Sequence, residues 1–347
     1  MNMKMMLRLR TLFVGSILLV LEVHANPQQP GVATALAKPH QERNFQTVAT
    51  DTNFHYWDKR YLLTWALTGN NDASPNRPAV IAYDAEGNQK DAVVWFDGAA
   101  RVGVSHVAVT DRGKLIVSGG MRTAEGVIAF YIADIGEDGR VAHVIRTNPF
   151  APVYICSGPD DTIWSYGFDR NENGNAVETA PVLRQFSFEK GQLQAMLPLS
   201  SLDRKWRLPA GRYPEEVIMR CNASRVVIYN GNASQWVQYV FHTKALSLRQ
   251  VEALPPTSKM RISGFAMTDD GDVFASFHQR ANAVPMSGLF QLTFEGVGDG
   301  QWTPVPGTRG PYLRGSPIER LLGANGNSLV HTRARDGEVY WSNYSKR

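Results

Sequence analysis

Short apolar runs, each closed by a turn of small polar residues, make up most of the chain. From about Phe54 onward the runs are rich in Val, Ile, Phe, Tyr and Trp, and Gly, Asp and Asn close them. This pattern predicts β-strands joined by tight turns, because no convincing amphipathic helix appears in the same region. We therefore expect an all-β protein.

One unit recurs along the chain: an apolar strand, a turn, a second apolar strand that ends in small residues, and then a third strand. The hairpins of the unit cover residues 107–120, 153–167, 217–231, 264–277 and 319–332. The third strands cover residues 126–134, 181–188, 236–242, 288–294 and 337–344. Before them, segments 60–68, 78–84 and 91–97 look like the later strands of a further unit.

The spacing of these units favours a β-propeller. A blade of four short strands takes ~40–50 residues, so six units fit between Phe45 and Arg347. We predict a propeller of six four-stranded blades, with five or seven blades or a β-sandwich as alternatives. The chain ends on a third strand, so we expect an N-terminal strand at residues 44–50 to close the last blade and remove two open edges.

The first residues have the features of a secretory signal. Residues 1–25 carry a basic start, an apolar stretch of about ten residues and the small-x-small pattern that ends at Ala25. An uncleaved membrane anchor is the alternative, but a spanning helix needs ~20 apolar residues. We expect a signal peptide at 1–25, a flexible leader at 26–43 and a single propeller domain at 44–347. The mature protein would be secreted or periplasmic, with no stable membrane insertion.

Composition narrows the class of protein. Hydrophobic residues make up 43% of the 347 residues, and the formal net charge is +4. These values exclude a disordered chain, and the charge is too mild to predict nucleic-acid binding. Only two cysteines are present, Cys156 and Cys221, late in the first strands of consecutive units. Either they form a disulfide in an oxidising compartment, or they are two separate buried thiols.

Two hairpins carry a resemblance to a known family. The segments Thr110–Val117 (TDRGKLIV) and Thr268–Phe274 (TDDGDVF) resemble hairpins of the six-bladed propellers of the NHL-repeat and SMP-30/gluconolactonase-like superfamily. The resemblance implies a divalent metal in the channel, held by Glu and by Asn or Asp from separate inner strands. Here Glu216 and Glu319 open two inner strands, whereas Asn partners at the equivalent positions are missing.

Glu216, Glu319 and His106 are the catalytic candidates. Two carboxylates that face one channel are able to do acid–base work, and we expect His106 to open the inner strand of its blade. The alternative for both Glu residues is a salt bridge to a nearby Arg. No local zinc motif and no nucleophile elbow accompanies them.

Loops between blades would gather at one end of a propeller, and here they are basic. A funnel of arginines concentrates anions and offers bidentate contacts to carboxylate or phosphate. The alternative is that these loops only balance the acidic turns at the other end. The ligand-binding candidates are Arg101, Arg146, Arg207, Arg212, Arg261 and Arg314.

The loop at 167–181 contains oxygen donors at alternate positions. Asp169, Asn171 and Asn173 fit the first half of a calcium-binding loop, but Ala180 stands where that pattern has Glu. An exposed loop without metal is the alternative.

Taken together, these patterns favour a binding propeller, a monomer, that holds an anionic small molecule, glycan or peptide at a basic channel mouth. A metal-assisted hydrolase or lyase and a protein-interaction platform are the alternatives, so whether the protein is an enzyme stays open. No cofactor is certain; Ca²⁺ or another divalent metal is the candidate.

Overall fold

The computed structural model describes most of the repeated body and two short N-terminal segments. The described residues are 33–36, 41–43, 53–66, 74–171, 182–198, 217–231, 234–252, 260–279, 286–296, 298–305, 310–311, 319–333 and 338–346. The expected signal peptide at 1–25 lies outside them. Within these ranges, no helix is both long enough and apolar enough to cross a membrane.

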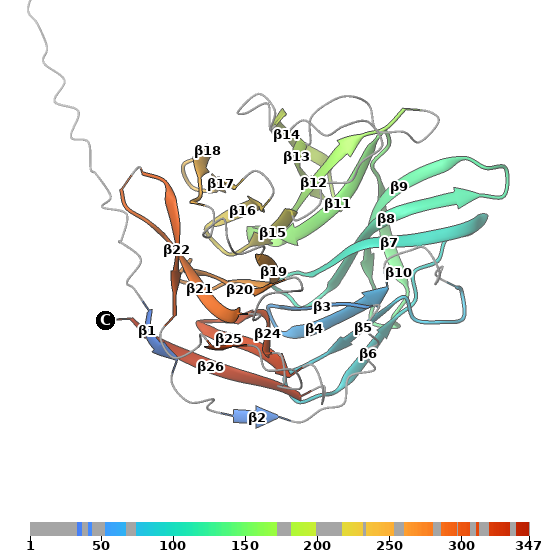
Figure 1. Cartoon of the computed structure of the whole chain (residues 1–347). Coiled ribbons are helices and arrows are strands. Elements are labelled where there is room, and N and C mark those ends of the chain that lie inside the picture. Colours follow the sequence, from blue (N-terminus) through green and yellow to red (C-terminus); the bar gives the residue numbers. More distant parts are fainter. Residues whose placement is uncertain are drawn as a thin grey trace, which may run out of the picture.

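The described strands form six antiparallel sheets around a common centre, so the fold is a β-propeller (Figure 1). The first sheet contains β3 (Asn53–Asp58), β4 (Tyr61–Ala66), β5 (Val80–Tyr83) and β6 (Gln89–Ala92). The second contains β7 (Ala99–Val109), β8 (Leu115–Thr123), β9 (Ile128–Ile135) and β10 (Val141–Arg146). The third contains β11 (Phe150–Ser157), β12 (Ile163–Asp169), β13 (Val182–Ser187) and β14 (Gly191–Pro198).

The remaining sheets follow the same order along the chain. The fourth contains β15 (Val217–Cys221), β16 (Arg225–Asn230), β17 (Gln235–Val240) and β18 (Ala245–Gln250). The fifth contains β19 (Met260–Met267), β20 (Val273–Gln279), β21 (Met286–Phe294) and β22 (Gly300–Pro304), and β23 (Gly310–Pro311) also pairs with β21. The sixth contains β24 (Glu319–Asn325), β25 (Ser328–Arg333) and β26 (Glu338–Lys346). We call these sheets blades 1 to 6.

The first strand of each blade lies innermost. These inner strands contact one another in the order β7, β11, β15, β19, β24 and β3, and β7 also contacts blade 1. The ring is therefore closed, and residues near the ends of the inner strands meet around the central axis. This confirms the predicted propeller and places the predicted hairpins on the inner two strands of blades 2 to 6.

Blade 6 is completed by N-terminal strands, but these strands lie earlier in the chain than expected. Two short strands, β1 (Ala33–Leu36) and β2 (Gln41–Arg43), pair with β26, whereas residues 44–50 lie outside the described part of the chain. The predicted flexible leader at 26–43 therefore contains the closing strands. The physical reason is the length of β26: its open edge offers hydrogen-bonding groups far beyond the reach of one short strand, and two segments use them.

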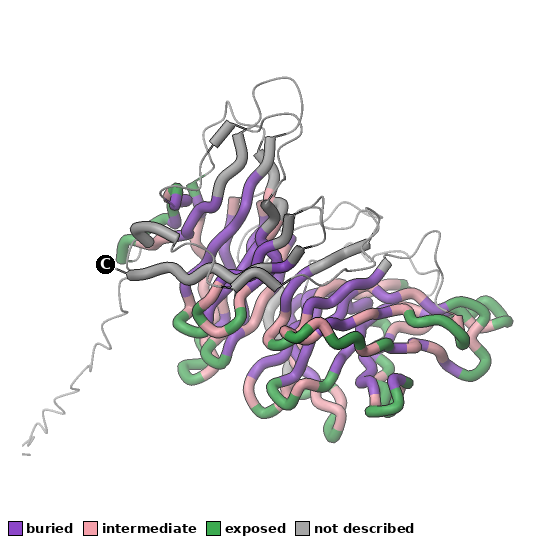
Figure 2. The backbone as a smooth tube through the Cα atoms, turned by 90° about the horizontal axis from the view of Figure 1, so that it is seen from below, coloured by how far each residue is buried: buried purple, intermediate pink, exposed green. Residues whose placement is uncertain are grey.

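Apolar runs in the strands are continuous because both faces of a blade are covered by neighbouring blades. In β8, Leu115 and Val117 pack into the core between blades 1 and 2, whereas Ile116 packs into the core between blades 2 and 3. Buried residues accordingly occupy the middle of the strands, and exposed residues occupy the turns (Figure 2). Burial on both faces gives a run of apolar residues instead of strict alternation.

The turn that carries the sequence resemblance repeats in atomic detail. In blade 2 the amide of Gly113 donates to the carbonyl of Thr110, and in blade 5 the amide of Gly271 donates to the carbonyl of Thr268, both at 2.9 Å. Gly113 has a φ of 80° and Gly271 a φ of 86°, values that favour glycine. The Thr-Asp-x-Gly sequence is therefore a turn that starts the second strand.

Candidate functional site

The described basic candidates do not form one cluster. Arg101 lies in β7 and Arg146 in β10, at opposite edges of blade 2, rather than in loops between blades. Arg146 lies over the ring of Phe96, with its guanidinium carbon 5.1 Å from the ring centroid. Arg261 belongs to β19, and its side chain lies outside the described residues, as do Arg207, Arg212 and Arg314 entirely. The basic mouth thus stays a prediction.

The calcium candidates are only partly described. The Asp169 carboxylate accepts hydrogen bonds from Nη2 of Arg184, with both oxygens at 3.0 Å. A cation at Asp169 would therefore compete with Arg184. Asn171 follows β12, and Asn173 lies outside the described residues. Among the described residues, no group of three His, Cys, Asp or Glu side chains is placed to hold a metal ion.

Of the catalytic candidates, only His106 has a described side chain. Glu319 is the first residue of β24, as predicted, but its side chain lies outside the described part, and so does Glu216. His106 does not open its strand; it lies near the end of β7, where a strand of eleven residues has reached the axis. There it belongs to a cluster that we call the axis cluster: Asp58, Tyr56, His106, Tyr154 and Arg220.

Arg220 is the central member of the axis cluster. It belongs to β15 of blade 4, yet its guanidinium carbon lies 4.3 Å from the centroid of Tyr56, a residue of β3 in blade 1. Blades 1 and 4 are opposite each other in a ring of six, so the side chain reaches across the axis. The residue before Arg220 in β15, Met219, is fully buried.

The guanidinium of Arg220 is poorly satisfied by the protein. Its Nη1 donates to the carbonyl of Met219 at 2.7 Å, and its Nε has no hydrogen-bond partner. Among the described residues, no carboxylate forms an ion pair with it. Burial lowers the pKa of Arg220, whereas the nearby Tyr56 and Asp58 raise it. Within the part of the chain that the structure describes, the group is therefore a cation without a direct counter-ion.

The Tyr56 ring under this cation belongs to a chain of ring contacts that spans three blades. The ring of His106 lies 5.3 Å from that of Tyr56 and 5.2 Å from that of Tyr154, measured between centroids. Trp65 packs edge-on against both Tyr56 and His106. The Tyr56 hydroxyl donates to the carbonyl of Val107, which ties blade 1 to blade 2.

His106 is neutral in this setting. Burial, and then the charge of Arg220, lower the pKa of His106 to about 3. Its Nδ1 faces the amide of Ile155 at 3.5 Å, so the ring proton lies on Nε2. The imidazole is thus a hydrogen-bond donor at neutral pH and a poor base.

Asp58 brings a carboxylate to the same end of the axis. Its Oδ2 accepts a hydrogen bond from the amide of Val109 at 2.7 Å. Burial raises the pKa of Asp58, although Lys59, Val109 and Arg220 act in the opposite direction. Solvent still reaches this region, because Asp58, Tyr154 and Arg220 are half-buried.

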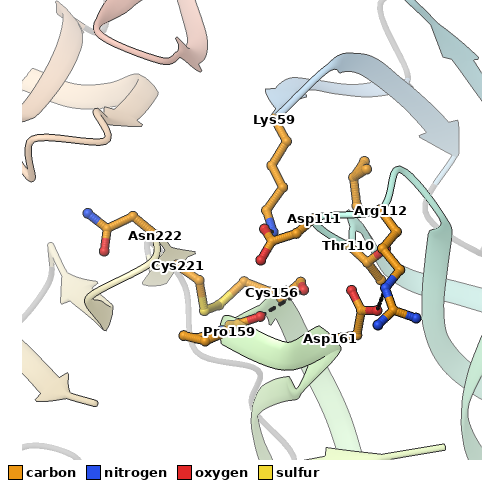
Figure 3. Close-up of polar contacts among 12 residues, drawn as sticks. Lys59, Thr110, Asp111, Arg112, Cys156, Pro159, Asp161, Cys221 and Asn222 are labelled. Carbon is orange, nitrogen blue, oxygen red and sulfur yellow. Dashed lines mark hydrogen bonds and ion pairs between the residues drawn. A yellow bond between two sulfur atoms is a disulfide. The ribbon is translucent and has the colours of Figure 1, made fainter. Parts of the chain in front are cut away.

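A second set of contacts joins the first hairpins of successive blades, and we call it the hairpin belt (Figure 3). Lys59 pairs with Asp111 between blades 1 and 2, and Arg112 pairs with Asp161 at 3.0 Å between blades 2 and 3. Cys156 and Cys221 form a disulfide between blades 3 and 4.

The belt continues between the later blades. Asn222 donates to the carbonyl of Thr268 at 3.2 Å, between blades 4 and 5. The amide of Asp270 donates to Oδ1 of Asn327 at 3.2 Å, between blades 5 and 6. Several acidic turn residues thus hold neighbouring blades together, which agrees with a structural role for them.

Sequence reasoning missed Arg220 and Asp58. One signal was available: Arg220 is the only charged residue within the apolar strand Val217–Cys221 (VIMRC). A charge inside a buried strand is costly and calls for an explanation. Asp58 resembled an ordinary residue at the start of a turn, so nothing in the sequence distinguished it.

No protein-family model and no curated protein sequence matches the chain. Similar solved structures include the periplasmic gluconolactonase of Pseudomonas aeruginosa, with 11% identity, a TM-score of 0.47, and coverage of 86% of this chain and 82% of that one. A gluconolactonase of Xanthomonas campestris has 13% identity and a TM-score of 0.42, and the match covers 91% of this chain and 97% of that one.

A luciferin-regenerating enzyme has 10% identity and a TM-score of 0.46, and the match covers 91% of this chain and 93% of that one. Identities this low and TM-scores below 0.5 do not carry the activities of those proteins over to this chain.

Proposed function

We propose that this protein is a binding propeller, secreted or periplasmic, that holds the carboxylate of a small molecule on Arg220 at the central axis. The observation that carries the proposal is the guanidinium that crosses the axis without a carboxylate partner among the described residues. A cation surrounded by protein is expensive unless an anion compensates it. A bound carboxylate would supply the missing acceptor for Nε and a second acceptor for Nη2.

The rest of the axis cluster suits this role. The Tyr56 ring, itself packed against His106, fixes the position of the guanidinium before any ligand arrives, which reduces the entropy that binding costs. The half-buried Tyr154 offers an aromatic surface that solvent, and therefore a ligand, is able to reach. The location outside the cytoplasm rests on the sequence of residues 1–25.

The hydrolase alternative gains no support from this geometry. His106 is held neutral with its proton on Nε2, and the side chains of Glu216 and Glu319 lie outside the described residues. We therefore favour binding over catalysis.

Calorimetric titration tests the proposal with acetate, propionate and benzoate as ligands. We expect Arg220→Gln to weaken carboxylate binding at least tenfold, since it removes the charge and the bidentate donor. Arg140→Gln is the matched control, because Arg140 is an exposed turn residue and its loss changes the net charge equally. Equal binding by the wild type and Arg220→Gln, or no binding of any carboxylate by the wild type, would rule the proposal out.

A further inference from the structure

We propose that the ligand of the axis cluster is a zwitterion, whose carboxylate binds Arg220 and whose ammonium binds the carboxylate of Asp58. This inference rests on the proposed function and identifies the class of its ligand. It starts from a second observation: the axis cluster contains a charge of each sign, and the two do not form an ion pair.

Only one of the two carboxylate oxygens of Asp58 has a hydrogen-bond partner among the described residues. Its Oδ2 accepts the amide of Val109, whereas its Oδ1 has no hydrogen-bond partner among the described residues. The adjacent cation, Lys59, pairs with Asp111 in the hairpin belt instead. One oxygen of the Asp58 carboxylate is therefore available to a cation from outside the protein.

Tyr56 sets the separation of the two charges. Arg220 lies over the ring of Tyr56, and Asp58 follows Tyr56 by two residues on the same face of β3. Residues two apart on a strand are separated by ~6.6 Å along the chain. Arg220 and Asp58 are close enough for each to affect the pKa of the other, but too far apart for an ion pair. A ligand with opposite charges a few bonds apart fits between them.

The surrounding groups favour a net-neutral ligand over a simple anion. Arg220 and Asp58 together carry no net charge, and His106 is neutral beside them. A simple anion would leave one uncompensated negative charge in a poorly solvated place, whereas a zwitterion leaves none.

The test compares amino acids with carboxylates of the same length. Glycine, β-alanine and 4-aminobutyrate are titrated against acetate, propionate and butyrate, because the span between the two charges decides which chain length fits. We expect at least one amino acid to bind tenfold or more tightly than its matched carboxylate. In Asp58→Asn this preference falls below threefold, while the carboxylates bind as well as or better than they do to the wild type.

Glu137→Gln is the control substitution, since it removes one negative charge from an exposed turn of blade 2. It should leave the preference for the amino acid unchanged. The inference is wrong if no amino acid binds more tightly than its carboxylate, or if Asp58→Asn keeps the preference. In those cases the carboxylate titrations with Arg220→Gln still decide the proposed function separately.

Discussion

At the scale of single residues, two arginines of neighbouring strands differ in how they are bonded: Arg225 joins two blades, whereas Arg220 does not. Arg225 opens β16 and donates to the carbonyl of Gly271 and, at 3.2 Å, to Gln238, so it joins blade 4 to blade 5. Among the described residues, the side chain of Arg220 makes one hydrogen bond, to the carbonyl of its own neighbour Met219. A residue kept at a cost to the folded state is a candidate for function, because stability alone would replace it.

Substitution by methionine separates these two roles. Arg220→Met should leave the free energy of unfolding unchanged or raise it by about 1–2 kcal/mol, since it replaces an unpaired buried charge with an apolar chain of similar length. Arg225→Met should lower it by about 1–3 kcal/mol, because it removes two hydrogen bonds to a charged group. Urea unfolding monitored by tryptophan fluorescence measures both values. A large loss of stability in Arg220→Met would show that the guanidinium has a structural role instead.

The buried histidines predict how stability depends on pH. Burial lowers the pKa of His106 to about 3 and that of His331 to about 4. Below a pH of ~6.5 the unfolded chain therefore binds protons that the folded chain does not. The free energy of unfolding should fall as the pH falls from ~6.5 to ~4, by up to about 1.4 kcal/mol per pH unit for each histidine. Asp58, with its raised pKa, acts in the opposite direction.

Unfolding by urea at pH 7, 6 and 5 measures this slope. His331→Gln should reduce the slope between pH 6 and pH 5 by about 1.4 kcal/mol per pH unit, because one titrating group is gone. An unchanged slope in this variant would mean that His331 is already protonated in the folded protein.

The candidate site was only partly predictable at this scale. His106 could be chosen because it lies in an inner strand, but its neutral state depends on burial and on Arg220, which belong to other parts of the fold. Asp58 and Arg220 are 162 positions apart in the sequence. Only the ring geometry brings them together, so no local pattern could pair them.

At the scale of elements, the hairpins were predictable because their turns have a specific chemistry. The Thr-Asp-x-Gly turns place glycine where φ is positive, and apolar runs flank them. The closing strands β1 and β2 were not predictable, because their sequences, ATAL and QER, have little apolar patterning. They are strands because the edge of β26 supplies hydrogen-bonding partners.

Close approach of the inner strands depends on glycine at particular positions. A Cβ at Gly264 of β19 would overlap the carbonyl oxygen of Leu321 in β24, and a Cβ at Gly323 would overlap the carbonyl oxygen of Trp57 in β3. In both cases the glycine faces the backbone of the next blade. The innermost strands of blades 5, 6 and 1 therefore pack with no room for a side chain at these points.

Gly264→Ala should lower the free energy of unfolding by about 1–3 kcal/mol or more, since backbone atoms must move to admit the methyl group. Gly120→Ala is the control, because the nearest atom to its Cβ is a side-chain carbon of Phe130 at 3.4 Å, an ordinary contact. We expect the control to change stability by less than about 1 kcal/mol. Thermal and urea unfolding measure both variants. An equal change in the free energy of unfolding for the two would mean that the inner strands are free to separate.

At the scale of the whole molecule, the hairpin belt joins the first hairpins of successive blades from blade 1 to blade 6. Its links are of three kinds: ion pairs between blades 1, 2 and 3, a disulfide between blades 3 and 4, and amide hydrogen bonds between blades 4, 5 and 6. The charge pattern of the turns was visible in the sequence, but the partner of each acid was not, because it lies on another blade about fifty residues away.

Removal of the disulfide tests how much the belt contributes. Cys156 and Cys221 are 65 positions apart, and closing a loop of that size stabilises the folded state by about 4 kcal/mol in the chain-entropy model. The double variant Cys156→Ser, Cys221→Ser should lose stability of about this size. The wild type with its disulfide reduced provides the comparison. If the double variant and the reduced wild type each lose less than about 1 kcal/mol in the free energy of unfolding, the other links of the belt are enough to hold the blades together.

The pairing of β1 with β26 has a consequence for engineering. Ala33 lies directly opposite Lys346, so the two ends of the described part of the chain run side by side as the arms of an antiparallel pair. A dipeptide such as Asn-Gly between them would complete a hairpin of ordinary geometry. The chain can then be reopened at an exposed turn such as that at Gly126, giving a circular permutant whose ring is sealed by a covalent bond.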